Sequence, residues 1–266
     1  MKDLNHIKLF LLDMDGTFYL GDQLLEGSKQ FVDTIAQLKG RDFLFLTNNS
    51  SKNSYHYLEK LEKMGFLFPP EKIMTSGEAT IHYLQKQYPN QKVYLVGTDS
   101  LKQEFLQSNI LLTEYDPDIA VLGFDTSLTY EKLWKLCDFV RTAKPFVATH
   151  PDLNCPIEGG YMPDIGGVIA FVEACTNRKP DVVIGKPNRS IIQAVSNKLQ
   201  IPFDEIAMVG DRLYTDIAVG INANITSILV LTGETSLSDL ENSQIQPDYI
   251  FKNLGELAEK LKFLED

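Results

Sequence analysis

The alternation of short apolar runs with helical stripes is the feature that most restricts how this chain can fold. The runs are rich in Val, Ile, Leu and Phe and mostly uninterrupted, which is typical of parallel strands covered on both faces. Between them, apolar residues recur at helical spacing, as in Phe31, Ile35 and Leu38. The runs predict strands at residues 7–12, 43–46, 93–96, 119–122, 146–148, 182–184, 206–209 and 225–231. This order predicts an α/β fold with a doubly wound parallel sheet.

The first predicted strand runs directly into Asp13-Met14-Asp15-Gly16-Thr17. A buried, unpaired carboxylate is costly, and two carboxylates two residues apart face the same side of an extended strand. Their repulsion indicates a bound metal ion or a pair of acids that act in sequence. A plain strand-ending turn is the alternative, since Asp and Gly are ordinary turn residues. A calcium loop is excluded, because its last ligand position, counted from Asp13, is Leu24 rather than Glu.

Three further predicted strands end in groups that suit an anionic ligand or a cation. They lead to Thr47 and Asn48, to Lys186, and to Asp211 with Asp216 shortly after it. Ligands of such sheets bind beyond the carboxyl ends of the strands, so we expect these groups to meet there. The predicted strands between them end in ordinary turns. This asymmetry predicts two domains, a discontinuous core and an inserted second α/β unit.

The composition argues against several classes of function. The net charge of −11 is unfavourable for binding nucleic acid or an anionic membrane surface. The three cysteines show no CxxC spacing, which argues against a disulfide framework or a structural zinc site. No segment approaches the length of a membrane span, and the first apolar run is too short for a signal peptide, so we expect a cytoplasmic protein. No G-x-G-x-x-G follows a strand, which excludes dinucleotide binding.

Four motifs occur in the order of a known family: D-M-D-G-T, L-T-N-N-S, G-K-P and G-D-R-L-Y-T-D. Together they resemble the haloacid dehalogenase superfamily of phosphohydrolases. The loop A-T-H-P-D-L, with G-G-Y-M-P-D-I-G-G after it, is similar to the NagD-type, 4-nitrophenylphosphatase-like branch. The resemblance covers nearly the whole chain. It implies a Rossmann-like catalytic core formed by residues 1–79 and 180–266, and an inserted, smaller α/β cap domain of the C2 type formed by residues 80–179.

The resemblance also implies catalytic and phosphate-binding roles. Asp13 would be the nucleophile that attacks phosphorus and forms an aspartyl phosphate. Asp15 would protonate the leaving alkoxide and then act as the base toward water. Thr47 and Asn48 would donate hydrogen bonds to the phosphoryl oxygens, and Lys186 would neutralise their charge. Each of these residues also has a purely structural alternative, such as a helix cap for Thr47 or a solvated turn lysine for Lys186.

A magnesium site follows from the same resemblance. Its protein ligands would be the carboxylate of Asp13, the backbone carbonyl of Asp15, and Asp211, since Mg²⁺ prefers a few carboxylates together with phosphate oxygen and water. Asp216 would assist from a second layer, through water or by fixing Lys186.

The chain departs from the family pattern in the cap loop. His150 stands where relatives usually have Asn, and Asp164 stands where they often have Gly. With Tyr161, these residues are predicted to contact the leaving group and to set substrate specificity. The alternative is that His150 makes a hydrogen bond within the cap loop and has no role toward substrate.

The leading functional hypothesis is an enzyme, a Mg²⁺-dependent phosphomonoester hydrolase acting on a small phosphorylated metabolite such as a sugar phosphate. One alternative is a phosphomutase or phosphotransferase that uses the same aspartyl phosphate. Another is a metabolite-binding protein without catalysis. The expected partner is a small phosphate ester rather than nucleic acid or membrane, and a homodimer through the cap stays open because caps of this type can form dimer contacts.

Overall fold

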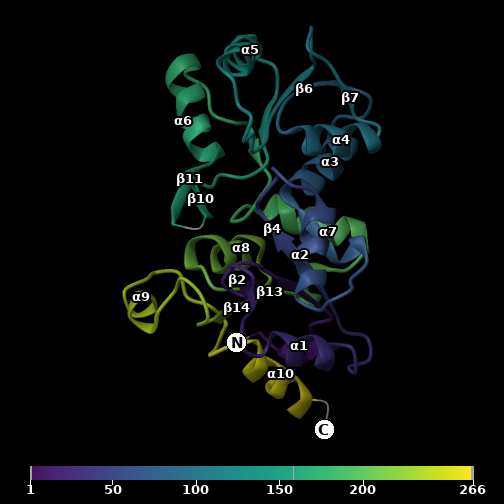
Figure 1. Cartoon of the computed structure of the whole chain (residues 1–266), viewed down its shortest axis with the longest axis vertical. Helices are drawn as coiled ribbons and strands as arrows, with labels where there is room; N and C mark the ends of the chain where they lie inside the picture. Colours follow the sequence, from purple (N-terminus) through teal and green to yellow (C-terminus); the bar gives the residue numbers. More distant parts are fainter. Residues whose placement is uncertain (1, 158, 265–266) are drawn as a thin grey trace. The chain divides into compact units, whose positions relative to one another are not determined.

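The computed structural model describes residues 2–157 and 159–264 and confirms the predicted α/β class with parallel sheets (Figure 1). The chain divides into two compact units. The first unit consists of Met1–Thr47, Leu58–Met74 and Lys186–Asp266, and the second of Asn48–Tyr57 and Thr75–Gly185. The interval predicted to form the cap, residues 80–179, lies inside the second unit.

A six-stranded sheet forms the centre of the first unit, in the order β15-β14-β13-β1-β4-β5. Its strand β1 (Leu9–Leu12) runs parallel to both β13 (Ile206–Gly210) and β4 (Asp42–Thr47). Because Leu12 is in register with Val209 on one side and Phe45 on the other, the three strands end at one edge. The other strands of this unit are β5 (Ile73–Thr75), β14 (Thr226–Val230), β15 (Tyr249–Phe251) and the hairpin β2 (Tyr19–Leu20) and β3 (Gln23–Leu24).

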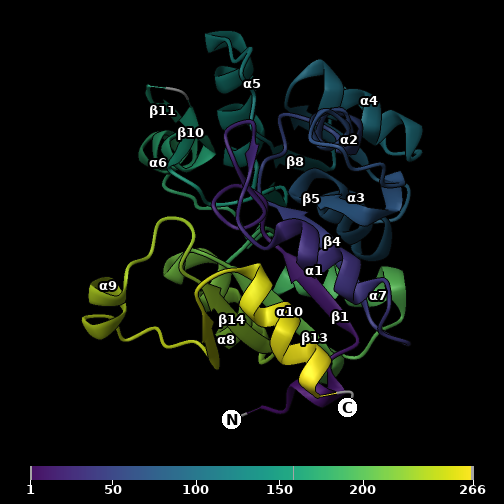
Figure 2. The same ribbon diagram turned by 60° about the horizontal axis from the view of Figure 1, so that its bottom comes forward.

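Helices α1 (Ser28–Ile35) and α10 (Leu254–Phe263) lie side by side over the strands of this sheet (Figure 2). The contact is close because Gly27, which precedes α1, meets Gly255 of α10: a Cβ on Gly27, whose φ is +85°, would lie 2.0 Å from the backbone nitrogen of Gly255. The remaining helices of this unit are the end of α2 (Ser54–Lys63), α7 (Arg189–Leu199), α8 (Ala218–Ala223), α9 (Leu237–Glu241), the 3₁₀ turns η1 (Leu4–His6), η2 (Pro70–Lys72) and η3 (Phe203–Glu205), and the π-helical turn η4 (Leu213–Ile217).

The second unit has its own parallel sheet, in the order β12-β9-β8-β6-β7. Its strands are β6 (Lys92–Val96), β7 (Leu111–Leu112), β8 (Ile119–Leu122), β9 (Phe146–Ala148) and β12 (Val182–Val183), with a hairpin of β10 (Asn154–Ile157) and β11 (Gly160–Pro163). The helices are α3 (Ser76–Gln87), α4 (Asp99–Gln107), α5 (Tyr130–Arg141) and α6 (Ile165–Thr176). A buried cluster that includes Tyr94, Phe146 and Val172 joins α5 and α6 to this sheet.

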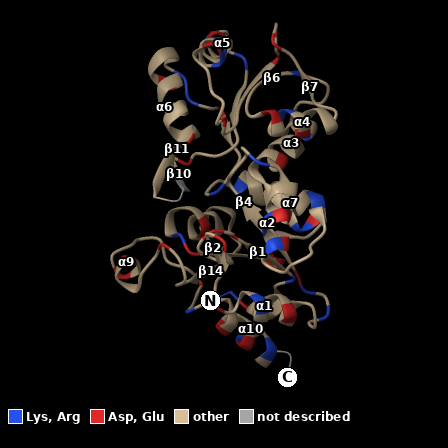
Figure 3. Cartoon of the chain, viewed as in Figure 1, with Lys and Arg blue, Asp and Glu red and all other residues tan. Residues whose placement is uncertain are grey.

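Acidic and basic positions are interspersed along the elements of both units, as Figure 3 shows. The net charge of −11 is therefore not concentrated on one helix or strand. Among the described residues, no helix is both long enough and apolar enough to span a membrane.

Candidate active site

Lys186 links the predicted catalytic and metal-binding carboxylates at the carboxyl edge of the first sheet. Its Nζ lies 2.5 Å from Oδ1 of Asp13 and 2.7 Å from Oδ1 of Asp216, and it also donates to the carbonyl oxygen of Leu46 at 3.3 Å. The side chain is only 3% exposed, so the alternative of a solvated turn lysine is wrong. Burial by itself would lower the pKa of Lys186, but Asp13 and Asp216 outweigh this effect and raise it. The ammonium group is therefore charged.

Asp211 and Asp216 lie together with Asp13. One carboxylate oxygen from each of the three lies within 4.8 Å of the others. Asp211 is held by the hydroxyl of Thr17, which donates to Oδ1 at 3.2 Å, and by the backbone N–H of Glu234, which donates to Oδ2 at 2.7 Å. Burial, reinforced by the neighbouring carboxylates, raises the pKa of Asp211 to about 7 and that of Asp216 to about 6.

Two glycines make room for Asp211. A Cβ on Gly16 would lie 2.4 Å from Oδ2 of Asp211, and a Cβ on Gly233 would lie 2.0 Å from the same atom. Gly16 also has a φ of +87°, which other residues rarely adopt. Gly16 therefore has two roles in the site: it turns the chain after Asp15, and it leaves space for the carboxylate of Asp211.

These residues fit a divalent cation that prefers oxygen. Three clustered carboxylates beside one ammonium group leave an excess of negative charge in a buried position, which a cation would neutralise. Carboxylate oxygens are the ligands that Mg²⁺ takes from proteins, with water and phosphate oxygen filling its other positions. Asp216 is itself one of the three clustered carboxylates, and it accepts a hydrogen bond from Nζ of Lys186.

Asp15 lies on the more exposed side of the same strand end. Its side chain is 54% exposed, and Nζ of Lys60 lies 3.9 Å from its Oδ1. Desolvation by the surrounding chain raises the pKa of Asp15, Lys60 opposes this effect, and the charge of Asp13 adds to it. A carboxyl group whose pKa is raised can hold the proton that general acid catalysis delivers.

The second strand-end motif is divided between the two units. Thr47 is the last residue of β4 in the first unit, whereas Asn48 begins the second unit. There the amide nitrogen of Asn48 donates to both carboxylate oxygens of Asp152, at 3.0 and 3.1 Å. The side-chain donor that we predicted for phosphate is therefore directed at a carboxylate of its own unit.

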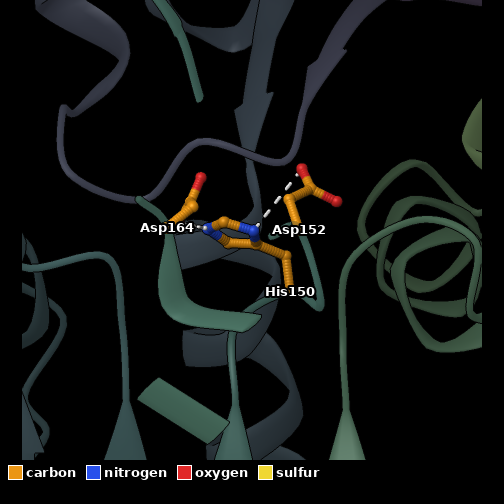
Figure 4. A group of neighbouring side chains, drawn as sticks. All are labelled: His150, Asp152 and Asp164. Carbon is orange, nitrogen blue, oxygen red and sulfur yellow. Dashed lines mark ion pairs between the residues drawn. The ribbon is translucent and has the colours of Figure 1, made fainter. Parts of the chain in front are cut away.

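The cap-loop residues differ in exposure within the second unit. Tyr161 is 74% exposed, whereas His150 and Asp164 are buried. Nε2 of His150 lies 3.6 Å from Oδ1 of Asp164 (Figure 4). Neither ring nitrogen of His150 makes a hydrogen bond, so the alternative of a cap-loop hydrogen bond is wrong. Their burial favours a role of His150 and Asp164 inside the unit over direct contact with substrate.

Sequence reasoning missed three residues of these surroundings. Thr17, although part of the first motif, had no assigned role until its contact with Asp211 was seen. Lys60 comes from a segment without a motif and Asp152 from the A-T-H-P-D-L loop, and tertiary folding brings them to Asp15 and Asn48. For Asp152, the polar loop A-T-H-P-D was the available signal.

Comparison with known proteins identifies the family. Residues 10–110 match the model of the haloacid dehalogenase-like hydrolases, and residues 183–257 match a second HAD-hydrolase-like model. An acid sugar phosphatase from Staphylococcus aureus is 36% identical over 97% of this chain and 100% of its own length. The chain belongs to the haloacid dehalogenase-like hydrolases.

Solved structures of this family superpose on nearly the whole chain. A 4-nitrophenylphosphatase from Thermotoga maritima is 49% identical, with a TM-score of 0.92 over 96% of this chain and 98% of that one. A glycerol phosphate phosphatase from Mycobacterium tuberculosis, in complex with magnesium, is 29% identical, with a TM-score of 0.87 over 97% of this chain and 79% of that one. The predicted NagD-type, 4-nitrophenylphosphatase-like branch is confirmed, and this haloacid dehalogenase-like hydrolase is a phosphatase.

Proposed function

We propose that this haloacid dehalogenase-like phosphatase hydrolyses small phosphate esters of the sugar phosphate class, with Mg²⁺, through an aspartyl phosphate on Asp13. The observation that carries the proposal is the position of Lys186, which contacts both Asp13 and Asp216 from a buried site. A charged ammonium group beside the attacking carboxylate reduces its repulsion with an anionic phosphoryl group. The relatives named acid sugar phosphatase and glycerol phosphate phosphatase support the substrate class.

In the proposed reaction, Asp13 is the nucleophile and Asp15 is the general acid and base. Oδ of Asp13 attacks phosphorus, and the bond from phosphorus to the ester oxygen breaks as the aspartyl phosphate forms. Asp15, with its raised pKa, holds the proton that the departing alkoxide receives. Asp15 then accepts a proton from the water that attacks the acyl phosphate, which releases inorganic phosphate and restores Asp13. Lys186 stays charged and orients Asp13 throughout.

The proposed metal ligands are Asp13, Asp211 and the backbone carbonyl of Asp15, with Asp216 beside them. The clustering of the carboxylates of Asp13, Asp211 and Asp216 and the magnesium complex of a relative support this assignment. When bound, Mg²⁺ would supply positive charge for the phosphoryl oxygens. Thr47 and the N–H of Asn48 are the proposed phosphate donors, since the amide of Asn48 is directed at Asp152.

A panel of phosphorylated metabolites tests the proposal. We expect free phosphate to be released from sugar phosphates and glycerol phosphate with Mg²⁺, and its release to stop when a chelator removes the metal. The control is Asp13→Asn, which keeps the side-chain shape but is a far poorer nucleophile. Formation of an isomeric sugar phosphate, dependent on a sugar bisphosphate and without free phosphate, would show a phosphomutase instead.

A further inference from the structure

A lysine from outside the motifs lies beside the proposed acid in the first unit. Nζ of Lys60 is 3.9 Å from Oδ1 of Asp15, and it lies over the ring of Tyr19, 3.8 Å from the ring centroid. Lys60 belongs to the last turn of α2, where no motif marks it. The carboxyl group proposed to deliver the proton therefore has an ammonium group as its neighbour.

The ring of Tyr19 fixes the ammonium group of Lys60. Tyr19 is 0% exposed, and it belongs to the turn that follows Asp15. In this turn the N–H of Gly16 donates to the carbonyl of Tyr19 at 2.8 Å, and the N–H of Tyr19 donates to the carbonyl of Met14 at 3.1 Å. A cation over the face of an aromatic ring is attracted by the negative charge of that face. One hydrogen-bonded turn therefore positions both Asp15 and the ring that holds Lys60.

This support distinguishes the pair of Lys60 and Asp15 from an ordinary surface ion pair. Exposed pairs contribute little, in part because a long lysine side chain must lose its freedom to form them. Here Tyr19 restrains the lysine, whose side chain is 30% exposed. The Asp15 side chain is 54% exposed, so packing restrains it less than the lysine. The attraction between the two groups therefore orients Asp15 rather than Lys60.

We propose that Lys60 is a positioning residue for proton transfer by Asp15, an inference that rests on the proposed role of Asp15 as the acid. Because the ammonium group faces Oδ1, it favours the proton on Oδ2 and holds the carboxyl group in one orientation. As the O–H bond of Asp15 breaks and the departing alkoxide receives the proton, Asp15 becomes negative. A positive charge 3.9 Å away stabilises this carboxylate, and Lys60 itself gives up no proton.

Two leaving groups test the proposal in the full-length enzyme with Mg²⁺. We would measure kcat/KM for glycerol phosphate, whose alkoxide needs a proton, and for 4-nitrophenyl phosphate, whose leaving group needs little protonation. General acid catalysis contributes about 100-fold or more, and Lys60→Met should lose about 10-fold of this on glycerol phosphate but at most about 2-fold on 4-nitrophenyl phosphate. Lys60→Arg keeps the positive charge and should recover most of the loss.

The matched control is Lys63→Met, which removes an exposed lysine from the same turn of α2. It should leave both values of kcat/KM unchanged. A purely structural role of Lys60 would slow both substrates alike, because a distorted turn affects Asp13 as well as Asp15. Equal losses on the two substrates in Lys60→Met, or no loss on either, would therefore overturn the proposal.

A double variant separates failure of this inference from failure of the proposed acid. In an Asp15→Ala background, Lys60→Met should cause no further loss on glycerol phosphate, because the carboxyl group through which Lys60 acts is gone. If Asp15→Ala slows glycerol phosphate selectively and Lys60→Met does not, the acid role stands and the role of Lys60 is refuted. If Asp15→Ala slows both substrates equally, the proposed acid role fails, and the positioning role of Lys60 is overturned with it.

Discussion

Removal of the Lys186 ammonium group should destabilise the metal-free protein far more than removal of an exposed lysine. In Lys186→Met, the carboxylates of Asp13 and Asp216 lose the cation that lies 2.5 and 2.7 Å from them. Lys186 and Asp216 have side chains only 3% and 1% exposed. Loss of one partner of a buried ion pair costs about 3–5 kcal/mol, since the other charge stays buried.

The matched control is Lys8→Met. Lys8 contacts Glu205 at the same 2.7 Å, but its side chain is 56% exposed. An exposed pair contributes about 0.2–1 kcal/mol, so the two variants should differ by several kcal/mol. The assay is urea unfolding of the metal-free proteins, with the midpoints converted to free energies by their common slope.

A double variant separates charge from packing. Asp216→Asn removes one of the carboxylates that Lys186→Met leaves unpaired, so the double variant should recover a large part of the lost free energy of unfolding. Phosphatase activity should stay at least about 100-fold below wild type in both, because the charge beside Asp13 is still missing. The reasoning is refuted if Lys186→Met unfolds within about 1 kcal/mol of Lys8→Met.

The remaining predictions concern the acid, a glycine and pH. Asp15→Ala should slow hydrolysis of alkyl phosphates more than that of 4-nitrophenyl phosphate, whose leaving group needs less protonation; equal losses in kcat/KM would exclude Asp15 as the acid. Gly233→Ala should weaken Mg²⁺ binding at least about 10-fold by calorimetry, because its Cβ would meet Asp211. Gly167→Ala, where a Cβ meets nothing and the φ is not positive, should leave binding unchanged. The pKa of Asp211, raised to about 7, means that the metal-free folded protein binds more protons than the unfolded chain between roughly pH 4 and 7. The contribution of Asp211 to the free energy of unfolding of the metal-free protein should therefore fall as pH rises through that window. The increase in Tm on adding Mg²⁺ should become larger between about pH 5.5 and about pH 8. An increase in Tm that is the same at both pH values would contradict the pKa of Asp211.

The sequence predicted the interior strands of both sheets and the edge strand β12, but it missed the other edge strands. The predicted strands at 119–122 and 146–148 coincide with β8 and β9, whose residues are all buried. Asn253, a residue type favoured at helix starts, caps α10 by accepting a hydrogen bond from the N–H of Glu256. Strands β5 and β15 were missed because each has three residues and lies at an edge of the sheet. Short edge strands lack the long apolar run that marks a buried strand.

For the site, the motifs predicted the residues but not all of their contacts. Asp13 and Asp216 meet because the parallel strands β1 and β13 end at one edge of the first sheet, which the alternation of strands and helices already implies. Lys186 follows β12, a strand of the other sheet, so the strand order does not explain its contact with them. The partner of Asn48 could not be predicted, because Asp152 lies 104 residues further along the chain. The burial of His150 was equally hidden, since a loop of polar residues normally predicts exposure.

Chemical trapping of the phosphorylated enzyme tests the central claim most directly. Wild type, mixed with a phosphate ester and Mg²⁺ and quenched in acid within its first turnover, should carry one phosphoryl group. Borohydride reduction should then convert the modified residue to homoserine, and peptide mass spectrometry should locate it at position 13. Asp13→Asn should show no label under the same conditions. A label at another residue, or rapid turnover by Asp13→Asn without any label, would contradict the aspartyl phosphate mechanism.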